Sequence, residues 1–265
     1  MLFSESPRRG RHVVSLFDHS GYAVRPWAEA GYICLCYDIL HPAEGRIEKV
    51  GAGEIRFIHA DLNAGASGWP RVRNDVAGAS VAMLFAWPPR DDLAVSSARH
   101  FEVKRRELGA DFQERAAARA TEVACLGEEL GVPWMVENLI SGLSRLWRKY
   151  DVIWHPYEFG GYLPEGDEHP KWPKYTAPRE AYTKKTGAWT EGDFIFPERK
   201  PVEPEILENP PTKTGKIVRG SRHFMKLGGK SAETKEIRNL TPRGFSQAVF
   251  EANAGHPSIS MEAAE

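Results

Sequence analysis

The chain has few cysteines, no long hydrophobic run and almost no net charge. Its three cysteines, Cys34, Cys36 and Cys125, are too few and too unevenly spaced for a disulfide framework or a metal site. No stretch approaches the roughly 20 apolar residues of a membrane span, and residues 1–7 lack the apolar core of a signal peptide. These absences predict a cytoplasmic protein with no membrane partner and no bound metal, and Cys34 and Cys36, two residues apart in an apolar run, are expected to share one face of a strand as core filler.

The net charge of −1 conceals an uneven distribution of charged residues. Between residues 213 and 243, nine basic side chains face two acidic ones, Glu233 and Glu236, so the stretch carries a net charge of +7. The basic residues are Lys213, Lys216, Arg219, Arg222, Lys226, Lys230, Lys235, Arg238 and Arg243. Charge alone leaves two interpretations open, a surface that faces nucleic-acid phosphates or a solvated irregular loop.

Short apolar runs alternate with helical patterns in the first half of the chain. The runs are residues 12–17, 32–37, 55–58, 81–85 and 133–136. Helices are expected at 23–30 and 111–130, stopped by Gly31 and Gly131. This alternation predicts an α/β fold with a mostly parallel sheet covered by helices on both faces.

The composition changes beyond residue 150 and divides the chain into three expected parts. Residues 1–150 form the α/β core, and residues 151–215, which are rich in Pro, Gly and aromatic residues, form an irregular subdomain over the ligand edge of the sheet. Residues 216–265 hold the basic segment and a C-terminal helix that returns to the core. Thr241 is expected to cap this helix, with Pro242 in its first turn.

Polar residues follow the first three expected strands. The turn at residues 17–21 contains Gly21 and precedes a helix, so its backbone amides can approach the polar groups of a ligand. Asp38 closes the second strand, where a carboxylate can accept hydrogen bonds from both hydroxyls of a ribose. Asp61, after the third strand, could bind an adenine amine. Alternatively, both aspartates simply cap turns.

The stretch at residues 85–99 is the most informative in the chain. Its diproline, Pro88 and Pro89, follows a buried strand, prevents ladder pairing and holds the backbone extended. The next residues, Arg90, Asp91 and Asp92, therefore project from the carboxyl end of the strand. Ligands of open α/β sheets bind at that edge.

Three motifs together resemble those of a known enzyme family. Residues 14–21, the diproline loop and residues 136–138 match, in order and rough spacing, the cofactor, catalytic and base-binding motifs of the S-adenosylmethionine-dependent DNA cytosine-5 methyltransferases. The chain is most similar to a compact group of DNA cytosine methyltransferases in phages and prophages. That similarity extends over nearly the whole chain, through residues 143–149, 182–186, 226–230 and 241–245.

The resemblance implies a Rossmann-like class I methyltransferase fold, S-adenosylmethionine as cofactor, DNA as partner and a flipped cytosine, or a modified cytosine, as substrate. The implied cofactor residues are Phe17, Asp18, Ser20, Gly21, Asp38, Ile39, Asp61, Leu62 and Pro88. The implied catalytic residues are Pro89, Arg90, Asp91, Glu137 and Asn138. In the family pattern Glu137 binds the ring nitrogen and amine of cytosine and protonates the ring. Without the resemblance, Glu137 could be a turn residue followed by Asn138 as a cap.

The chain departs from the family at the residue after the diproline. A cysteine thiolate attacks the cytosine ring there in the family, whereas this chain has Arg90, whose guanidinium offers no free electron pair. Two alternatives to cytosine-5 methylation are therefore open. One is methylation of the cytosine amine, with Asp91 or Asp92 accepting the proton, although Trp87 and Arg90 differ from the residues that such enzymes place around the diproline. The other is a non-catalytic DNA-binding protein, in which Arg90 pairs with Asp91 or Asp92 or binds a phosphate.

Overall fold

The computed structural model describes residues 11–93, 100–140, 142–209, 211, 215, 217–229 and 231–255. Residues 94–99 of the diproline stretch lie outside the described residues, as do Lys213, Lys216 and Lys230 of the basic segment.

An eight-stranded sheet runs through the described part of the chain, in the order β3-β4-β2-β1-β5-β6-β8-β7. Strands β4, β2, β1, β5 and β6 are parallel, whereas β3 pairs antiparallel with β4 and β8 lies antiparallel between β6 and β7. The strands are β1 His12–Leu16, β2 Ile33–Asp38, β3 Arg46–Val50, β4 Gly53–His59, β5 Val81–Ala86, β6 Trp134–Leu139, β7 Val152–Trp154 and β8 Thr186–Glu191.

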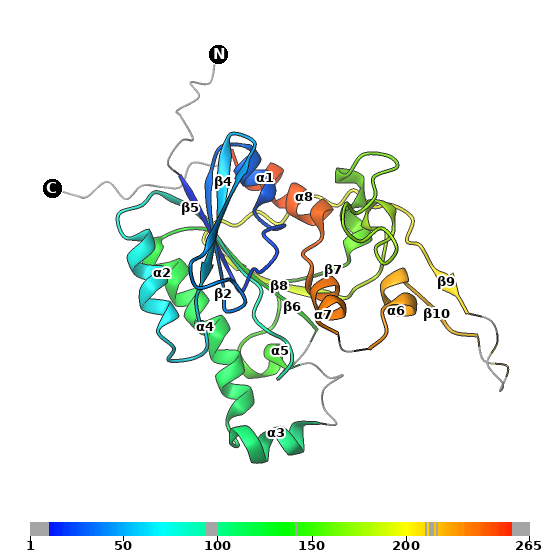
Figure 1. Cartoon of the computed structure of the whole chain (residues 1–265), viewed down its shortest axis with the longest axis horizontal. Coiled ribbons are helices and arrows are strands. Elements are labelled where there is room, and N and C mark those ends of the chain that lie inside the picture. Colours follow the sequence, from blue (N-terminus) through cyan, green and yellow to red (C-terminus); the bar gives the residue numbers. More distant parts are fainter. Residues whose placement is uncertain are drawn as a thin grey trace.

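Helices cover both faces of this sheet (Figure 1). Alternate residues of β1 face opposite sides, so that Val14 packs with α2 and α4 while Val13 packs with α1 and α8. The helices are α1 Arg25–Glu29, α2 Gly68–Val76, α3 Phe101–Leu108, α4 Phe112–Leu130, α5 Leu143–Leu146, α6 Arg222–Lys226, α7 Ala232–Asn239 and α8 Arg243–Asn253. The predicted fold class, a mostly parallel sheet with helices on both faces, is confirmed.

Smaller elements complete the second half of the chain. Two 3₁₀ helices, η2 Pro156–Tyr162 and η3 Pro178–Glu180, lie in the stretch expected to be irregular. Strands β9 Leu207–Glu208 and β10 Arg219–Gly220 pair in a hairpin that projects from the body (Figure 1). Within the described ranges no helix is both long and apolar enough to cross a bilayer.

Cys34 and Cys36 share one face of β2, as their spacing predicts. Both thiols are fully buried, in the cluster that contains Trp27 of α1. Cys125 lies on α4 and is exposed.

Two local expectations differ from the structure. Strands β7 and β8 fall within residues 151–215 but belong to the main sheet, because Glu137, Asn138 and neighbouring residues of β6 pair in register with β8. The sequence of β8 mixes small, polar and aromatic residues, so it gives no apolar run. The N-cap of α8 is Pro242 and not Thr241. The buried carboxylate of Glu180 satisfies the first turn instead, since Gly244 N donates to its Oε2 at 3.0 Å.

Candidate functional site

A cavity of about 730 Å³ opens at the carboxyl ends of β1, β2, β4, β5 and β6. It is lined by every residue expected at the site except Gly21, namely Phe17, Asp18, Ser20, Asp38, Ile39, Asp61, Leu62, Pro88, Pro89, Arg90, Asp91, Glu137 and Asn138. Residues from five separate stretches of the sequence therefore meet in one place. This edge of a parallel sheet is where α/β proteins bind ligands.

The loop between β1 and α1 is held by the carboxylate of Asp18. Its oxygens accept hydrogen bonds from Ser15 Oγ at 2.8 Å, Ser20 N at 3.1 Å and Gly21 N at 2.7 Å. The amides of Ser20 and Gly21 are thus satisfied within the loop by the Asp18 carboxylate. Gly21 has a φ of +70°, a conformation that L side chains rarely adopt, and a Cβ at this position would lie 3.0 Å from the Phe57 ring.

Two histidines that the sequence analysis did not select support the same loop. His41, buried after β2, lies with Nε2 3.1 Å from the carbonyl oxygen of Asp18. Burial lowers the pKa of His41, so the ring is neutral and Nε2–H donates to that carbonyl. His19 stacks on His41 with ring centroids 5.2 Å apart and lines the cavity. The feature of the sequence that could have indicated these two histidines is their position shortly after the parallel strands β1 and β2.

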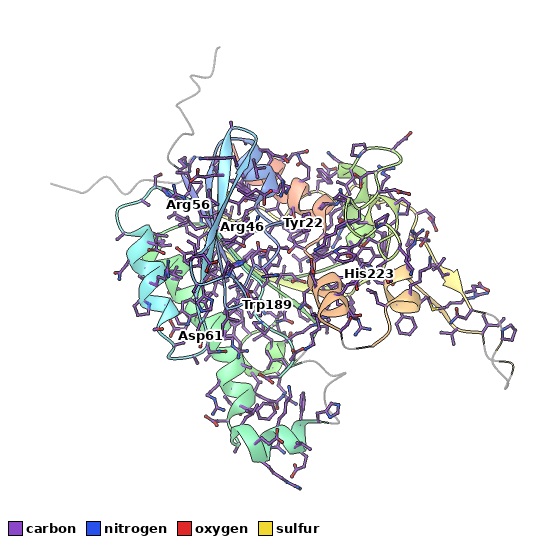
Figure 2. The ribbon with its side chains drawn as sticks, viewed as in Figure 1. Tyr22, Arg46, Arg56, Asp61, Trp189 and His223 are labelled. Atoms are coloured by element: carbon purple, nitrogen blue, oxygen red, sulfur yellow. The ribbon has the colours of Figure 1, made fainter. Side chains whose placement is uncertain are left out.

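Asp38 and Asp61 present carboxylates to the cavity (Asp61 is labelled in Figure 2). Each also holds its own turn, Asp38 by accepting from Leu40 N at 2.8 Å and Asp61 by accepting from Asn63 N at 2.9 Å. In both cases this bond uses Oδ1, and Oδ2 has no hydrogen bond to a described residue. Burial raises the pKa of Asp38. Beside it, Ile39 and Leu40 are 50% and 70% exposed and form an apolar wall of the cavity.

The diproline loop is fixed to both neighbouring strands. Trp87 N donates to Leu16 O at 3.0 Å, and Trp87 Nε1 donates to Ser15 Oγ at 3.1 Å. On the other side, Asn138 Nδ2 donates to Pro88 O at 3.0 Å. The loop that presents Arg90 is therefore held on the side of β1 and on the side of β6.

The acidic residues after Arg90 do not form close ion pairs with it. Asp92 pairs with Lys104 of α3 at 2.7 Å and does not line the cavity. Asp91 lines the cavity and attracts Arg90 electrostatically. Within the described residues, no carboxylate lies within 4.0 Å of the Arg90 guanidinium.

Three ionisable side chains meet at the other end of the cavity from Asp61. Arg90 follows β5, Glu137 lies on β6, and Lys184 lies two residues before the start of β8. Burial raises the pKa of Glu137, while the charges of Lys184 and Arg90 oppose that shift. Burial likewise lowers the pKa of both Lys184 and Arg90, with Glu137 opposing the shift. Lys184 was not predicted from the sequence as a site residue, although it lies within the 182–186 stretch of family resemblance.

Helix α7 forms a further wall of the cavity that the sequence did not predict. Its residues Glu233, Lys235, Glu236 and Arg238 line the space. Arg238 also donates to Leu227 O at 2.6 Å, and Lys171 pairs with Glu236 at 2.6 Å. Lys235 and Arg238 are thus the described members of the basic segment that reach the cavity.

Other members of the basic segment are ion-paired away from the cavity. Arg219 pairs with Glu208 at 2.7 Å, and Arg222 pairs with Glu205. Arg243 pairs with Asp167 and Glu180. These carboxylates, which lie outside residues 213–243, reduce the positive charge that the sequence alone assigned to the segment.

The lining of the cavity contains no cysteine. Burial raises the pKa of both Cys34 and Cys36, which lie inside the sheet, and Cys125 lies on the outer side of α4. Among the residues that the structure describes, no group of three or more His, Cys, Asp or Glu side chains is arranged to hold a metal ion.

Comparisons with known proteins add little. No family model matches the chain, and no curated protein matches it significantly. One solved structure, described as a candidate DNA modification methyltransferase encoded within an E. coli prophage, is similar at 13% identity with a TM-score of 0.39. The similarity covers 72% of this chain, which spans about half (52%) of that structure. A likeness this distant carries no argument about the function of this chain.

Proposed function

We propose that this chain is an S-adenosylmethionine-dependent DNA methyltransferase, which binds the cofactor and one flipped base in the same cavity. The observation that carries the proposal is the convergence of the separate motifs, from Phe17 to Asn138, on a single space at the carboxyl edge of the sheet. A cavity of about 730 Å³ is within the range of small-molecule sites.

The residues at one end fit a nucleoside cofactor. Asp38 Oδ2 is available to accept from ribose hydroxyls, and Asp61 Oδ2 is available for an amine. Ile39 and Leu62 offer apolar surface to a flat ring. When bound, S-adenosylmethionine would supply a methyl group on a positively charged sulfur. The protein would bind and orient it through these side chains.

The other end supplies what a flipped base needs. Trp87 and Pro88 give flat surfaces, and Glu137 gives a carboxylate for the hydrogen-bonding edge. The diproline loop is already held in place by Ser15, Leu16 and Asn138. Positioning of the base would therefore require little rearrangement of the protein.

Cytosine-5 methylation, which the resemblance implies, lacks its nucleophile in this cavity. The ring carbon becomes reactive only after a thiolate adds to the neighbouring carbon, and the cavity lining holds no cysteine. Methylation of an exocyclic amine is the second candidate, because an amine needs no covalent adduct. A binding protein without catalysis is the remaining alternative.

Mass spectrometry of nucleosides tests this proposal. DNA from cells that express the protein is digested and compared with DNA from cells that express an Asp38→Ala variant. We expect a methylated base that depends on the intact protein. Absence of any methylated base, in cells where the folded protein is present, would favour the binding protein without catalysis.

A further inference from the structure

Arg90, Glu137 and Lys184 form a row of alternating charge along the edge of the sheet. They come from β5, β6 and β8, which are neighbours in that order. Strand β8 is antiparallel, so its first residues lie at the same edge as the last residues of β5 and β6. Glu137 itself pairs with Ala188 and Leu139 pairs with Thr186, so Lys184 lies two residues before the paired part of β8, beyond the end of β6. We call these three residues the charge row, with the carboxylate between two cations.

The members of the charge row do not neutralise one another by direct contact. No ion pair within 4.0 Å and no hydrogen bond joins any of their side chains to another described residue, although all three line the cavity and interact electrostatically. The other charges near Arg90 are Asp91, which attracts it, and Arg238, which repels it. All three residues are partly exposed and line the cavity, so a ligand bound there can supply the hydrogen bonds that the protein does not.

The order of the charges specifies the complementary edge of a base. Glu137 accepts hydrogen bonds, and Arg90 and Lys184 donate them, so the base should offer a donor between two acceptors. Cytosine carries its amine at the end of its edge, with N3 and O2 both on one side. Adenine carries its amine between N1 and N7, with one acceptor on each side.

Guanine and thymine fit the charge row less well as methyl acceptors. Thymine places a ring N–H, and no amine, between its two carbonyl groups. The guanine amine lies between the N1–H donor and the N3 acceptor. Adenine is therefore the base that places an exocyclic amine, which reacts without a thiol adduct, between two acceptors.

We propose that the cavity takes adenine as its target base, with N6 on Glu137 and the two flanking ring nitrogens on Arg90 and Lys184. This proposal rests on the proposed function. In the transfer, the N6 electron pair forms the N–C bond to the methyl carbon while the C–S bond breaks with its electrons moving to sulfur. The departing N6 proton goes to the Glu137 carboxylate. Arg90 is then a specificity-determining residue at the position of the family's cysteine.

Binding to four matched duplexes tests the target base. The full chain is titrated by fluorescence anisotropy into labelled duplexes that differ only in one base, A, C, G or T, set opposite an abasic site. We expect the A duplex to bind about ten-fold more tightly than the C duplex, since C leaves one cation of the charge row without an acceptor. Arg90→Gln and Lys184→Gln should each reduce the ratio of A-duplex affinity to C-duplex affinity towards one.

A neighbouring lysine gives the matched control. Lys185 is exposed and does not line the cavity, so Lys185→Gln should lower affinity for all four duplexes equally and keep the A to C ratio. The order of the wild-type protein's affinities for the four duplexes is measured without any variant. It therefore tests the proposal even if Arg90→Gln fails to fold. In a parallel reaction with S-adenosylmethionine, nucleoside mass spectrometry should find N6-methyladenine.

The outcomes separate this inference from the proposed function. Tightest binding to C or G, or equal binding to A and C, would overturn the adenine assignment and leave a DNA methyltransferase possible. A methyl group found on cytosine would do the same. Failure to bind any duplex, together with failure to bind S-adenosylmethionine in calorimetry, would overturn the proposed function itself.

Discussion

At the scale of single residues, Asp18 and Asp38 show how far the sequence can locate a site. Both aspartates follow parallel strands, and both were expected at the cofactor pocket. The carboxylate of Asp18 turns back onto Ser15, Ser20 and Gly21, whereas that of Asp38 keeps one oxygen available to the cavity. The sequence predicted where the two residues lie. It could not predict which oxygens the loop itself would use.

Arg90 carries a residue-scale prediction about covalent chemistry. DNA that contains 5-fluorocytosine traps cytosine-5 methyltransferases through a thiolate adduct. The wild-type protein should form no covalent complex, because no thiol lines its cavity. Arg90→Cys should permit trapping, since Trp87 and Pro88 hold the loop independently of the Arg90 side chain. Denaturing gels of the two proteins with this DNA provide the measurement.

A covalent complex with the wild-type protein would contradict the argument from Arg90. It would mean that another residue attacks the ring. The Arg90→Ala variant is the matched control, because it removes the guanidinium without supplying a thiol and should not be trapped.

At the scale of elements, β8 and α7 bring to the cavity the residues that could not be predicted from the sequence. Lys184 lies 47 residues after Glu137 and reaches it only because β8 inserts antiparallel beside β6. The sequence of β8, with Gly187 and polar residues among its aromatic ones, resembles the loops around it. Helix α7 closes a wall of the cavity through tertiary contacts of Ile237 and Leu240 with Tyr22 and Trp172, and a local pattern cannot show such contacts. The parallel strands β1, β2, β4 and β5, in contrast, were predicted because each is a short apolar run.

The loop that starts at His169 gives an element-scale prediction about pH. His169 Nδ1 accepts from Lys171 N at 3.3 Å and Trp172 N at 3.0 Å, and burial lowers its pKa to about 4. An unfolded histidine titrates near 6.5, so the unfolded chain binds more protons between these values. The free energy of unfolding should therefore fall as the pH drops from about 6.5 to about 4, by up to about 3 kcal/mol from this residue.

His169→Asn separates this effect from other titrations. The asparagine Oδ1 can accept the same two amide hydrogen bonds but does not titrate. Urea unfolding at pH 7 and pH 5 should show a smaller loss of stability in the variant than in the wild type. His223, whose pKa burial also lowers to about 4, should maintain part of the pH dependence. Equal losses in both proteins would contradict the role of His169.

At the scale of the whole molecule, ion pairs with carboxylates from outside the basic segment partly neutralise the positive charge that its sequence suggests. Arg219 and Arg222 are paired with Glu208 and Glu205, whereas Lys226 has no ion pair to a described residue. If this surface contacts DNA, Lys226→Gln should flatten the dependence of log affinity on log salt by about one unit. The double variant Arg219→Gln with Arg222→Gln should flatten it by less. Anisotropy titrations over a salt series measure both slopes, and a loss of about two units in the double variant would show that the ion pairs open for phosphates.

The central claim concerns the cavity that unites the separate motifs, and calorimetry with S-adenosylmethionine tests it most directly. The wild-type protein should bind the cofactor, and Asp38→Ala should weaken binding at least ten-fold, because a charge-assisted hydrogen-bond pair contributes roughly 1.5 to 3 kcal/mol. Glu165→Ala, which changes an exposed carboxylate that does not line the cavity, should leave affinity unchanged. Because burial raises the pKa of Asp38, the acid-side loss of wild-type affinity should begin at a higher pH than an ordinary aspartate would give, and this contribution should be absent from the variant. Equal affinity in the wild type and Asp38→Ala, or no binding to the folded wild-type protein, would contradict the account.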